Sequence, residues 1–280
     1  MEGLNKSIDI AEKDYRGLVV GNQAENFSVG ANLAMVMMMA VEQDWYELNM
    51  AIAMFQQTSM KLRYSSIPVI AAPFGMTLGG GCEFSMHADK IVAAAETYIG
   101  LVEVGVGLIP GGGGTKEFAL RALKGTLPDD VKTNHLRNYF MNIATAKVAT
   151  SAWEAKQMGI LTDKDIIVVN KDRQIAEAKR QAIVLDELGY TPPVPEKVKV
   201  LGNEAMGMFY VGTDQMVAGG YASEHDRKIA NKIGYVMTGG NLSEQTEVSE
   251  QYLLDLEREA FLSLCGERKT LERIGGMLKT

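Results

Sequence analysis

The chain has 280 residues, of which 46% are hydrophobic and 22% charged, with a formal net charge of −7. This composition suits a globular protein that buries a core without disulfides, and the two cysteines, Cys82 and Cys265, indicate a reducing compartment. The negative charge and the lack of a long basic run exclude a nucleic-acid partner. No apolar run approaches the ~18–20 residues that span a bilayer, so we expect a cytoplasmic protein without a membrane span.

The first 170 residues combine helical patterns with short apolar runs. Helical spacing of Leu4, Ile8 and Ala11 predicts a helix over 1–14, and a helical pattern returns over 33–65. Further helices are expected after Gly81, over 116–124 and ending near Gly159. Apolar runs between turn residues predict buried strands within 16–22, 67–73, 90–95 and 165–170. The pattern therefore indicates an α/β fold.

From residue 171 onward, helices dominate. The stretch "TPPVPEKVKVLGN" at 191–203 is expected to form a proline-rich turn. A terminal helix places Leu253, Leu256, Ala260 and Leu264 on one face, and Asn241 with Glu244 resembles a capping pair at its start. The predicted organisation is an α/β part followed by a mostly helical part.

Two glycine clusters stand out, and the first, Gly79–Gly81, follows a predicted strand and opens a helix. Such a turn presents free backbone N–H groups at a helix N-terminus, where an anion binds well. A phosphate site is excluded because neither G-x-x-x-x-G-K-[ST] nor G-x-G-x-x-G occurs. An oxyanion hole remains, and Gly30 with Ala31 offers a second loop for a donor.

Four stretches occur in an order that is typical of one family. They read "FSVGANL" (27–33), "PVIAAPFGMTLGGGCE" (68–83), "IGLVEVGVGLIPGGGGT" (99–115) and "SAWEAKQMGIL" (151–161). Together they resemble the crotonase (enoyl-CoA hydratase/isomerase) superfamily over roughly residues 15 to 165. The resemblance implies a crotonase-like spiral of ββα units in residues 1–165 and a mostly helical region, 166–280, for oligomerisation and active-site cover.

The resemblance also implies a chemistry, namely syn hydration of trans-2-enoyl-CoA to 3-hydroxyacyl-CoA in fatty acid β-oxidation. The backbone N–H groups of Ala31 and Gly80 would form the oxyanion hole, with Glu83 as base and Glu103 as acid. A like-charged pair in a partly apolar pocket tends to keep one member protonated, as this division needs. Substrate contacts would come from Val29, Gly30, Leu78, Gly79 and Gly111. No metal or cofactor is expected, and the partners would be acyl-CoA and identical chains in a trimer or hexamer.

Departures from the family pattern leave other functions open. Asn32 replaces an aspartate, Ala34 a lysine near the coenzyme phosphates, and Leu101 and Val102 replace polar and proline positions. The alternatives are an enoyl-CoA isomerase, for which one glutamate suffices, another crotonase reaction, or a non-catalytic acyl-CoA-binding module.

The family's first strands have no recognisable counterpart before the helix at 1–14. This observation suggests a fragment of a fused protein that joins the hydratase to an NAD-dependent 3-hydroxyacyl-CoA dehydrogenase.

Three other features have simpler interpretations. His87 lies four residues after Glu83 but has no third member for a relay, so a structural role is expected. Cys82 lacks an identified histidine partner and is expected to be buried. Met35 and Met37–Met39 could line an acyl tunnel, although core packing is the favoured interpretation.

Overall fold

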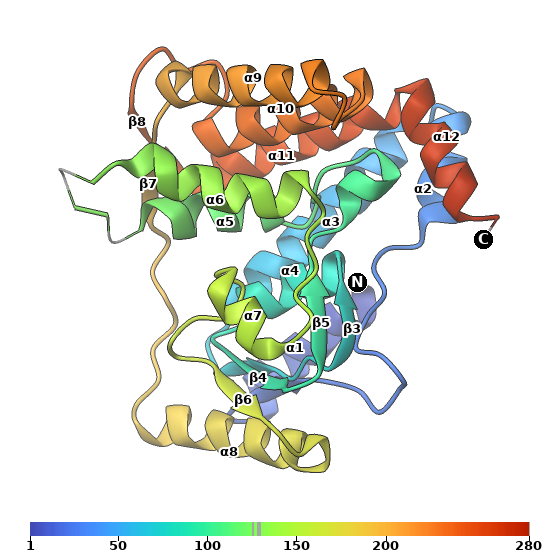
Figure 1. Ribbon diagram of the computed structural model, residues 1–280. Coiled ribbons are helices and arrows are strands. Elements are labelled where there is room, and N and C mark those ends of the chain that lie inside the picture. Colours follow the sequence, from blue (N-terminus) through green and yellow to red (C-terminus); the bar gives the residue numbers. More distant parts are fainter. Residues whose placement is uncertain (125, 128–129, 280) are drawn as a thin grey trace. The chain divides into compact units, whose positions relative to one another are not determined.

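The computed structural model describes residues 1–124, 126–127 and 130–279 (Figure 1). The chain groups into two units. The first unit comprises Met1–Ala31, Met54–Gly100 and Val148–Val194, and the second comprises Asn32–Ala53, Leu101–Lys147 and Pro195–Thr280. Each unit therefore consists of three separate stretches of the chain. The predicted boundary at residue 165, between the crotonase-like core and the helical region, stays a prediction. Across the described residues, none of the helices has the length and apolarity that crossing a bilayer requires.

A four-stranded parallel sheet forms the centre of the first unit. Its strands lie in the order β1, β2, β4 and β6. Their bounds are Leu18–Val20, Val69–Ala71, Lys90–Ala94 and Ile166–Val168. All four lie within the apolar runs that predicted strands, so these predictions are confirmed.

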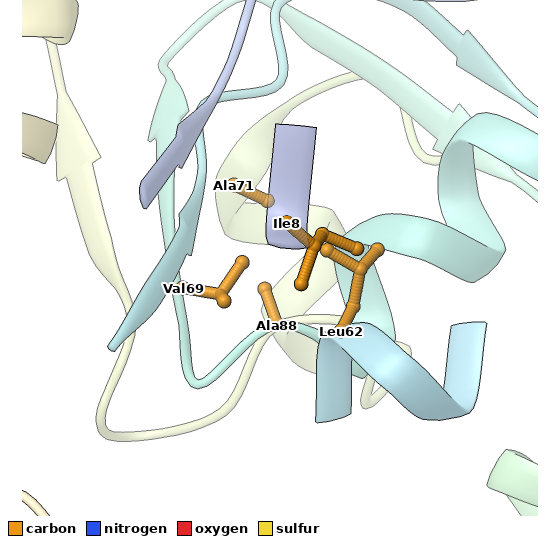
Figure 2. Close-up of a cluster of buried hydrophobic side chains, with 5 residues drawn as sticks. All are labelled: Ile8, Leu62, Val69, Ala71 and Ala88. Carbon is orange, nitrogen blue, oxygen red and sulfur yellow. The ribbon is translucent and has the colours of Figure 1, made fainter. Parts of the chain in front are cut away.

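Helices cover both faces of this sheet because alternate strand residues point to opposite sides. On one face, a cluster joins β2 to α1 (Glu2–Asp14) and to α3 (Trp45–Arg63), as Figure 2 shows. On the other face, α8 (Gln174–Glu187) packs on a second cluster. The first cluster contains Ile8, Leu62, Val69, Ala71 and Ala88, and the second contains Ile70, Ala72, Val92, Ala178 and Ala182. Burial on both sides explains why these strands carry continuous apolar runs.

A second, two-stranded parallel sheet in the first unit pairs β3 (Gly75–Leu78) with β5 (Thr97–Gly100). Along the chain, β2 of the four-stranded sheet is followed by β3 of the two-stranded sheet, and β4 of the four-stranded sheet is followed by β5 of the two-stranded sheet. Helix α4 (Gly80–His87) begins directly after β3. The unit also contains α7 (Ala152–Gln157) and the short η2 (Lys171–Arg173). This repeated strand–strand order is the α/β arrangement that the motifs predicted.

Helices dominate the second unit. Figure 1 shows α9, α10 and α11 side by side, in agreement with their contacts, and α5 packs against α6. Their bounds are α9 Asn203–Ala218, α10 Glu224–Thr238, α11 Glu250–Cys265, α5 Gly114–Leu123 and α6 Lys132–Ala144. The remaining elements are α2 (Leu33–Val41), η1 (Glu103–Val106), α12 (Arg268–Met277) and the antiparallel pair β7 (Lys197–Val200) and β8 (Thr246–Ser249). The helical carboxyl-terminal region is therefore confirmed.

Three sequence predictions were wrong. The single helix over 33–65 is two helices, because Gln43 adopts a left-handed backbone (φ 59°) that an α-helix cannot contain. The proline-rich stretch includes strand β7, whose residues alternate between exposed and buried. Asn241 and Glu244 do not cap the terminal helix; Ser249 does so by accepting a hydrogen bond from the Tyr252 N–H (3.2 Å).

Candidate active site

In the first unit, the loop that ends at Ala31 runs beside strand β3. Ser28 pairs with Thr77 in a parallel bridge, its N–H donates to the Met76 carbonyl (3.0 Å), and its carbonyl accepts from the Leu78 N–H (2.9 Å). This pairing places Val29–Ala31 next to the end of β3, which is Leu78, and the two residues that follow it, Gly79 and Gly80. The first unit thus contains the predicted residues Val29, Gly30, Ala31, Leu78, Gly79, Gly80 and Glu83.

The turn into α4 depends on glycine. Gly79 has φ 54° and ψ −121°, a conformation that residues with a Cβ rarely adopt. Its N–H donates to the Gly100 carbonyl (2.9 Å) and its carbonyl accepts from the Glu83 N–H (3.0 Å), which ties the turn to β5 and α4. At Gly81, a Cβ would lie 2.6 Å from the Ser28 Cβ. Only a glycine there lets α4 approach the Ser28 loop so closely.

Two backbone donors remain available at this place. Within the part of the chain that the structure describes, no hydrogen bond involves the N–H of Ala31 or of Gly80. Gly80 is the first residue of α4. The N–H groups of a helix's first turn have no partner inside the helix and form the positive end of its dipole. Two such donors on adjacent backbone segments can hold an oxygen that gains negative charge.

Glu83 lies in the first turn of α4, and its side chain is 1% exposed. The neighbouring His87 is also buried, and its Nδ1 lies 2.6 Å from the Glu83 carbonyl oxygen. That contact gives His87 the structural position expected for it. Cys82 is buried, as predicted.

Glu103 belongs to the second unit, where it begins η1. Its Oε2 is buried and has no hydrogen-bond partner among the described residues. Burial raises the pKa of Glu103 to about 7, and the negative charge of Glu257 on α11 adds to the rise. From the sequence, Glu83 is the expected like-charged partner of Glu103, and that pairing stays a prediction; within the second unit, Glu257 is the carboxylate whose charge acts on Glu103.

Glu257 also holds the second glycine cluster. Its Oε1 accepts from the Gly113 N–H (2.6 Å), and its Oε2 accepts from the N–H groups of Thr115 (2.8 Å) and Lys116 (3.1 Å). One turn later on α11, the Phe261 ring packs on Gly111, where an added Cβ would lie 3.0 Å from the ring. Helix α11 therefore fixes the Gly111–Gly113 turn by a carboxylate and by a ring.

A fully buried ion pair lies on the same two helices. Lys116 of α5 is 0% exposed, and its Nζ lies 2.9 Å from Glu250 Oε2 and 3.4 Å from Glu117 Oε2. Glu250 and Glu257 were not predicted from the sequence. The signal was present, because Glu257 interrupts the apolar face that Leu253 and Ala260 otherwise form on α11.

Comparison with known proteins decides the family. The model of the family "Enoyl-CoA hydratase/isomerase" matches residues 1–178. The chain belongs to the enoyl-CoA hydratase/isomerase family.

Two relatives of this enoyl-CoA hydratase/isomerase family member are much longer proteins. It is 50% identical over 276 residues to a Bacillus subtilis protein named "Probable 3-hydroxyacyl-CoA dehydrogenase", covering 98% of this chain and 34% of that protein. It is 30% identical over 280 residues to a Rickettsia felis "Putative fatty acid oxidation complex trifunctional enzyme", covering 99% and 35%. The chain thus spans about a third of the length of these relatives.

Solved structures show the same fold. An enoyl-CoA hydratase from Bacillus halodurans superposes with a TM-score of 0.64 at 15% identity, covering 98% of this chain and 88% of that one. An Acinetobacter baumannii protein described as a "putative enoyl-CoA hydratase/isomerase" gives a TM-score of 0.60 at 18% identity, covering 99% of this chain and 86% of that one. These similarities confirm the crotonase-like fold.

One departure from the family motifs, Asn32, lies at the start of α2 in the second unit. Asn32 caps α2 by accepting from the Met35 N–H (3.2 Å), a task that an aspartate would perform equally well. Met39 is buried, whereas Met35 and Met38 are 51% and 53% exposed. Core packing therefore explains only part of the methionine run.

Proposed function

We propose that this chain adds water to trans-2-enoyl-CoA and forms 3-hydroxyacyl-CoA, as in fatty acid β-oxidation. The observation that carries the proposal is the pair of unbonded N–H groups, those of Ala31 and Gly80, on adjacent segments of the first unit. The family match and the names of the relatives support an acyl-CoA substrate.

The two donors would bind the thioester carbonyl oxygen of the substrate. Water attack at C3 gives this oxygen enolate character, and the N–H groups stabilise the developing charge. Loss of one such donor typically costs about 2.7–4 kcal/mol of barrier. The position of Gly80 at the start of α4 adds the helix dipole to this stabilisation.

The proton transfers are assigned from the family motifs. Glu83 would take a proton from the attacking water, and Glu103 would give a proton to C2. A general acid works best when its pKa lies near the working pH, and the raised pKa of Glu103, about 7, supports this role. Both steps proceed without a metal or an organic cofactor. A trimer or hexamer remains our expectation for the assembly.

The proposed product suggests what the longer relatives do with it. The Bacillus subtilis relative is named for 3-hydroxyacyl-CoA dehydrogenation, and 3-hydroxyacyl-CoA is what the proposed hydration yields. We therefore infer that the chain supplies an NAD-dependent dehydrogenase with its substrate.

The test follows the loss of enone absorbance when the purified chain meets crotonyl-CoA. Glu83→Gln and Glu103→Gln should each lower kcat at least ~10²-fold, because general acid–base groups contribute about that much. Glu96→Gln, an exposed carboxylate of the same unit as Glu83, is the matched control and should leave kcat unchanged.

Two results would contradict the hydratase proposal. Turnover of 3-enoyl-CoA but not of 2-enoyl-CoA would identify an isomerase. A folded chain that binds crotonyl-CoA without converting it would be a binding module.

A further inference from the structure

The short helix η1 carries Glu103 but is too short to hold its own position. It is a single 3₁₀ turn, Glu103–Val106, in the second unit. Inside the turn, the Gly107 N–H donates to the Val104 carbonyl (3.0 Å) and the Leu108 N–H donates to the Glu103 carbonyl (3.0 Å). A turn of this length has little stability in isolation. The position of Glu103 therefore depends on contacts from the rest of the unit.

Helix α12 makes one of these contacts through a buried hydroxyl. Thr270 is 0% exposed, and its hydroxyl donates to the Gly107 carbonyl at the end of η1 (2.8 Å). The two backbones approach closely, because a Cβ on Gly107 would lie 2.9 Å from the Thr270 Cα. Gly107 also has φ 85°, in the left-handed region that favours glycine. The end of η1 is thus fitted directly against α12.

His225 of α10 orients the Thr270 hydroxyl. Its Nε2 lies 3.0 Å from the Thr270 Oγ1. A hydroxyl has one hydrogen to donate, and Thr270 gives it to the Gly107 carbonyl, so the Thr270 oxygen accepts from His225. A continuous chain of hydrogen bonds therefore runs from α10 through α12 to η1.

Arg273, one turn later on α12, makes a second contact with η1. Its Nη1 donates to the Val104 carbonyl (3.3 Å), and its Nη2 pairs with Asp226 of α10 (2.6 Å). Residues three positions apart lie on the same face of a helix. Thr270 and Arg273 therefore reach η1 from one face of α12, and each is joined to α10 as well.

We propose that Thr270 and Arg273 are positioning residues for Glu103: they bind the carbonyls of Gly107 and Val104 and so fix the backbone that carries the Glu103 side chain. The use of Glu103 as an acid rests on the proposed function, whereas the anchoring of η1 does not. The two ideas can therefore fail separately.

The anchoring is measured by hydrogen–deuterium exchange of the whole chain, without substrate, in peptides that span residues 103–108. Thr270→Val removes the hydroxyl and keeps the shape of the side chain. We expect the amides of Gly107 and Leu108 to exchange roughly tenfold faster in this variant, because the Gly107 carbonyl loses its donor. Thr270→Ser keeps a hydroxyl and should exchange at close to the native rate.

Thr238→Val is the matched control. Thr238 is also 0% exposed and belongs to the same unit, but its hydroxyl donates within α10, to the Gly234 carbonyl (2.9 Å). The control removes an equally buried hydroxyl that does not touch η1. It should leave the exchange of residues 103–108 at the native rate.

Crotonyl-CoA hydration tests what the anchoring does for Glu103. Misplacing a reacting group costs up to about 10²-fold in rate, so Thr270→Val should lower kcat by about 10–100-fold. KM should stay close to the native value, because the proposed oxyanion donors, Ala31 and Gly80, belong to the first unit. Thr270→Ser should recover most of kcat, and Thr238→Val should keep it. If Thr270→Val does not fold, Arg273→Met, at a partly exposed site, should show faster exchange and a smaller loss of kcat.

Native exchange over residues 103–108 in the folded variant would overturn the proposal. A native kcat in a variant that exchanges faster would also overturn it, because Glu103 would then not need the anchor. An equal loss of kcat in Thr238→Val would assign the effect to general stability and overturn it as well. A native chain that does not hydrate crotonyl-CoA would refute the proposed function, whereas faster exchange in Thr270→Val would still support the anchoring of η1 by α12.

Discussion

The two units hold their candidate functional groups by different means. In the first, the donors are backbone N–H groups, and their place depends on the φ angle of Gly79 and on the close approach of Gly81 to Ser28. In the second, buried charged side chains hold the structure. Glu257 accepts a hydrogen bond from Gly113 just before α5, and Lys116 forms ion pairs with Glu250 and Glu117. Backbone donors keep their charge distribution at every pH, whereas carboxyl groups do not. The comparison predicts steric sensitivity in the first unit and charge and pH sensitivity in the second.

The largest effect on stability is expected from Lys116→Met. Removing one partner of a buried ion pair leaves an uncompensated charge and typically costs about 3–5 kcal/mol. Lys124→Met is the control, because the Lys124–Glu196 pair is 67% and 56% exposed and exposed pairs contribute about 0–1 kcal/mol. Urea unfolding measures both, and similar losses in the two variants would refute a special role for the buried pair.

A steric effect on activity should follow in the first unit. In Gly81→Ala, the added Cβ would push Ser28 away and displace the loop that carries Ala31. We expect kcat for crotonyl-CoA to fall by about 10²–10³-fold, as when one oxyanion donor is lost. Gly3→Ala, where a Cβ meets nothing within 4 Å, should leave kcat at the native level. Native activity in Gly81→Ala would show that the approach to Ser28 is not needed.

A smaller effect concerns the pH dependence of stability. Burial raises the pKa of Glu103 from 4.5 to about 7, so the folded chain binds more protons than the unfolded chain between these values. Its contribution to the free energy of unfolding therefore falls as the pH rises from about 4.5 to about 7. In Glu103→Gln this decline should be shallower, as measured by urea unfolding at pH 5, 6 and 8. The same slope in both chains would contradict burial of a protonated Glu103.

The smallest effect is expected at the cap of α2. Asn32→Ala should lower the free energy of unfolding by about 1 kcal/mol, because the Met35 N–H loses its acceptor. Asn32→Asp keeps an acceptor and should stay close to the native stability. A loss in Asn32→Asp as large as in Asn32→Ala would mean that the side chain does more than cap.

Local sequence patterns predicted the strands whose residues are buried on both faces of the sheet. Strands β2 and β4 were visible because burial on both faces requires continuous apolar runs. Strand β3 was not predicted, since it mixes a glycine and an exposed methionine with one buried residue. The break at Gln43 also escaped notice, because nothing in the residues 42–45 marks a left-handed backbone.

The sequence by itself determined the order of the family motifs, the glycine turn before α4 and the candidates Ala31, Gly80, Glu83 and Glu103, because these depend on residue types at short, fixed spacings. Only the tertiary structure showed that Glu257 binds Gly113, which is 144 residues away in the chain. Contacts of this kind arise when helices pack, and no local pattern specifies which buried carboxylate will meet which turn. The tertiary structure alone therefore decided the charge that surrounds Glu103.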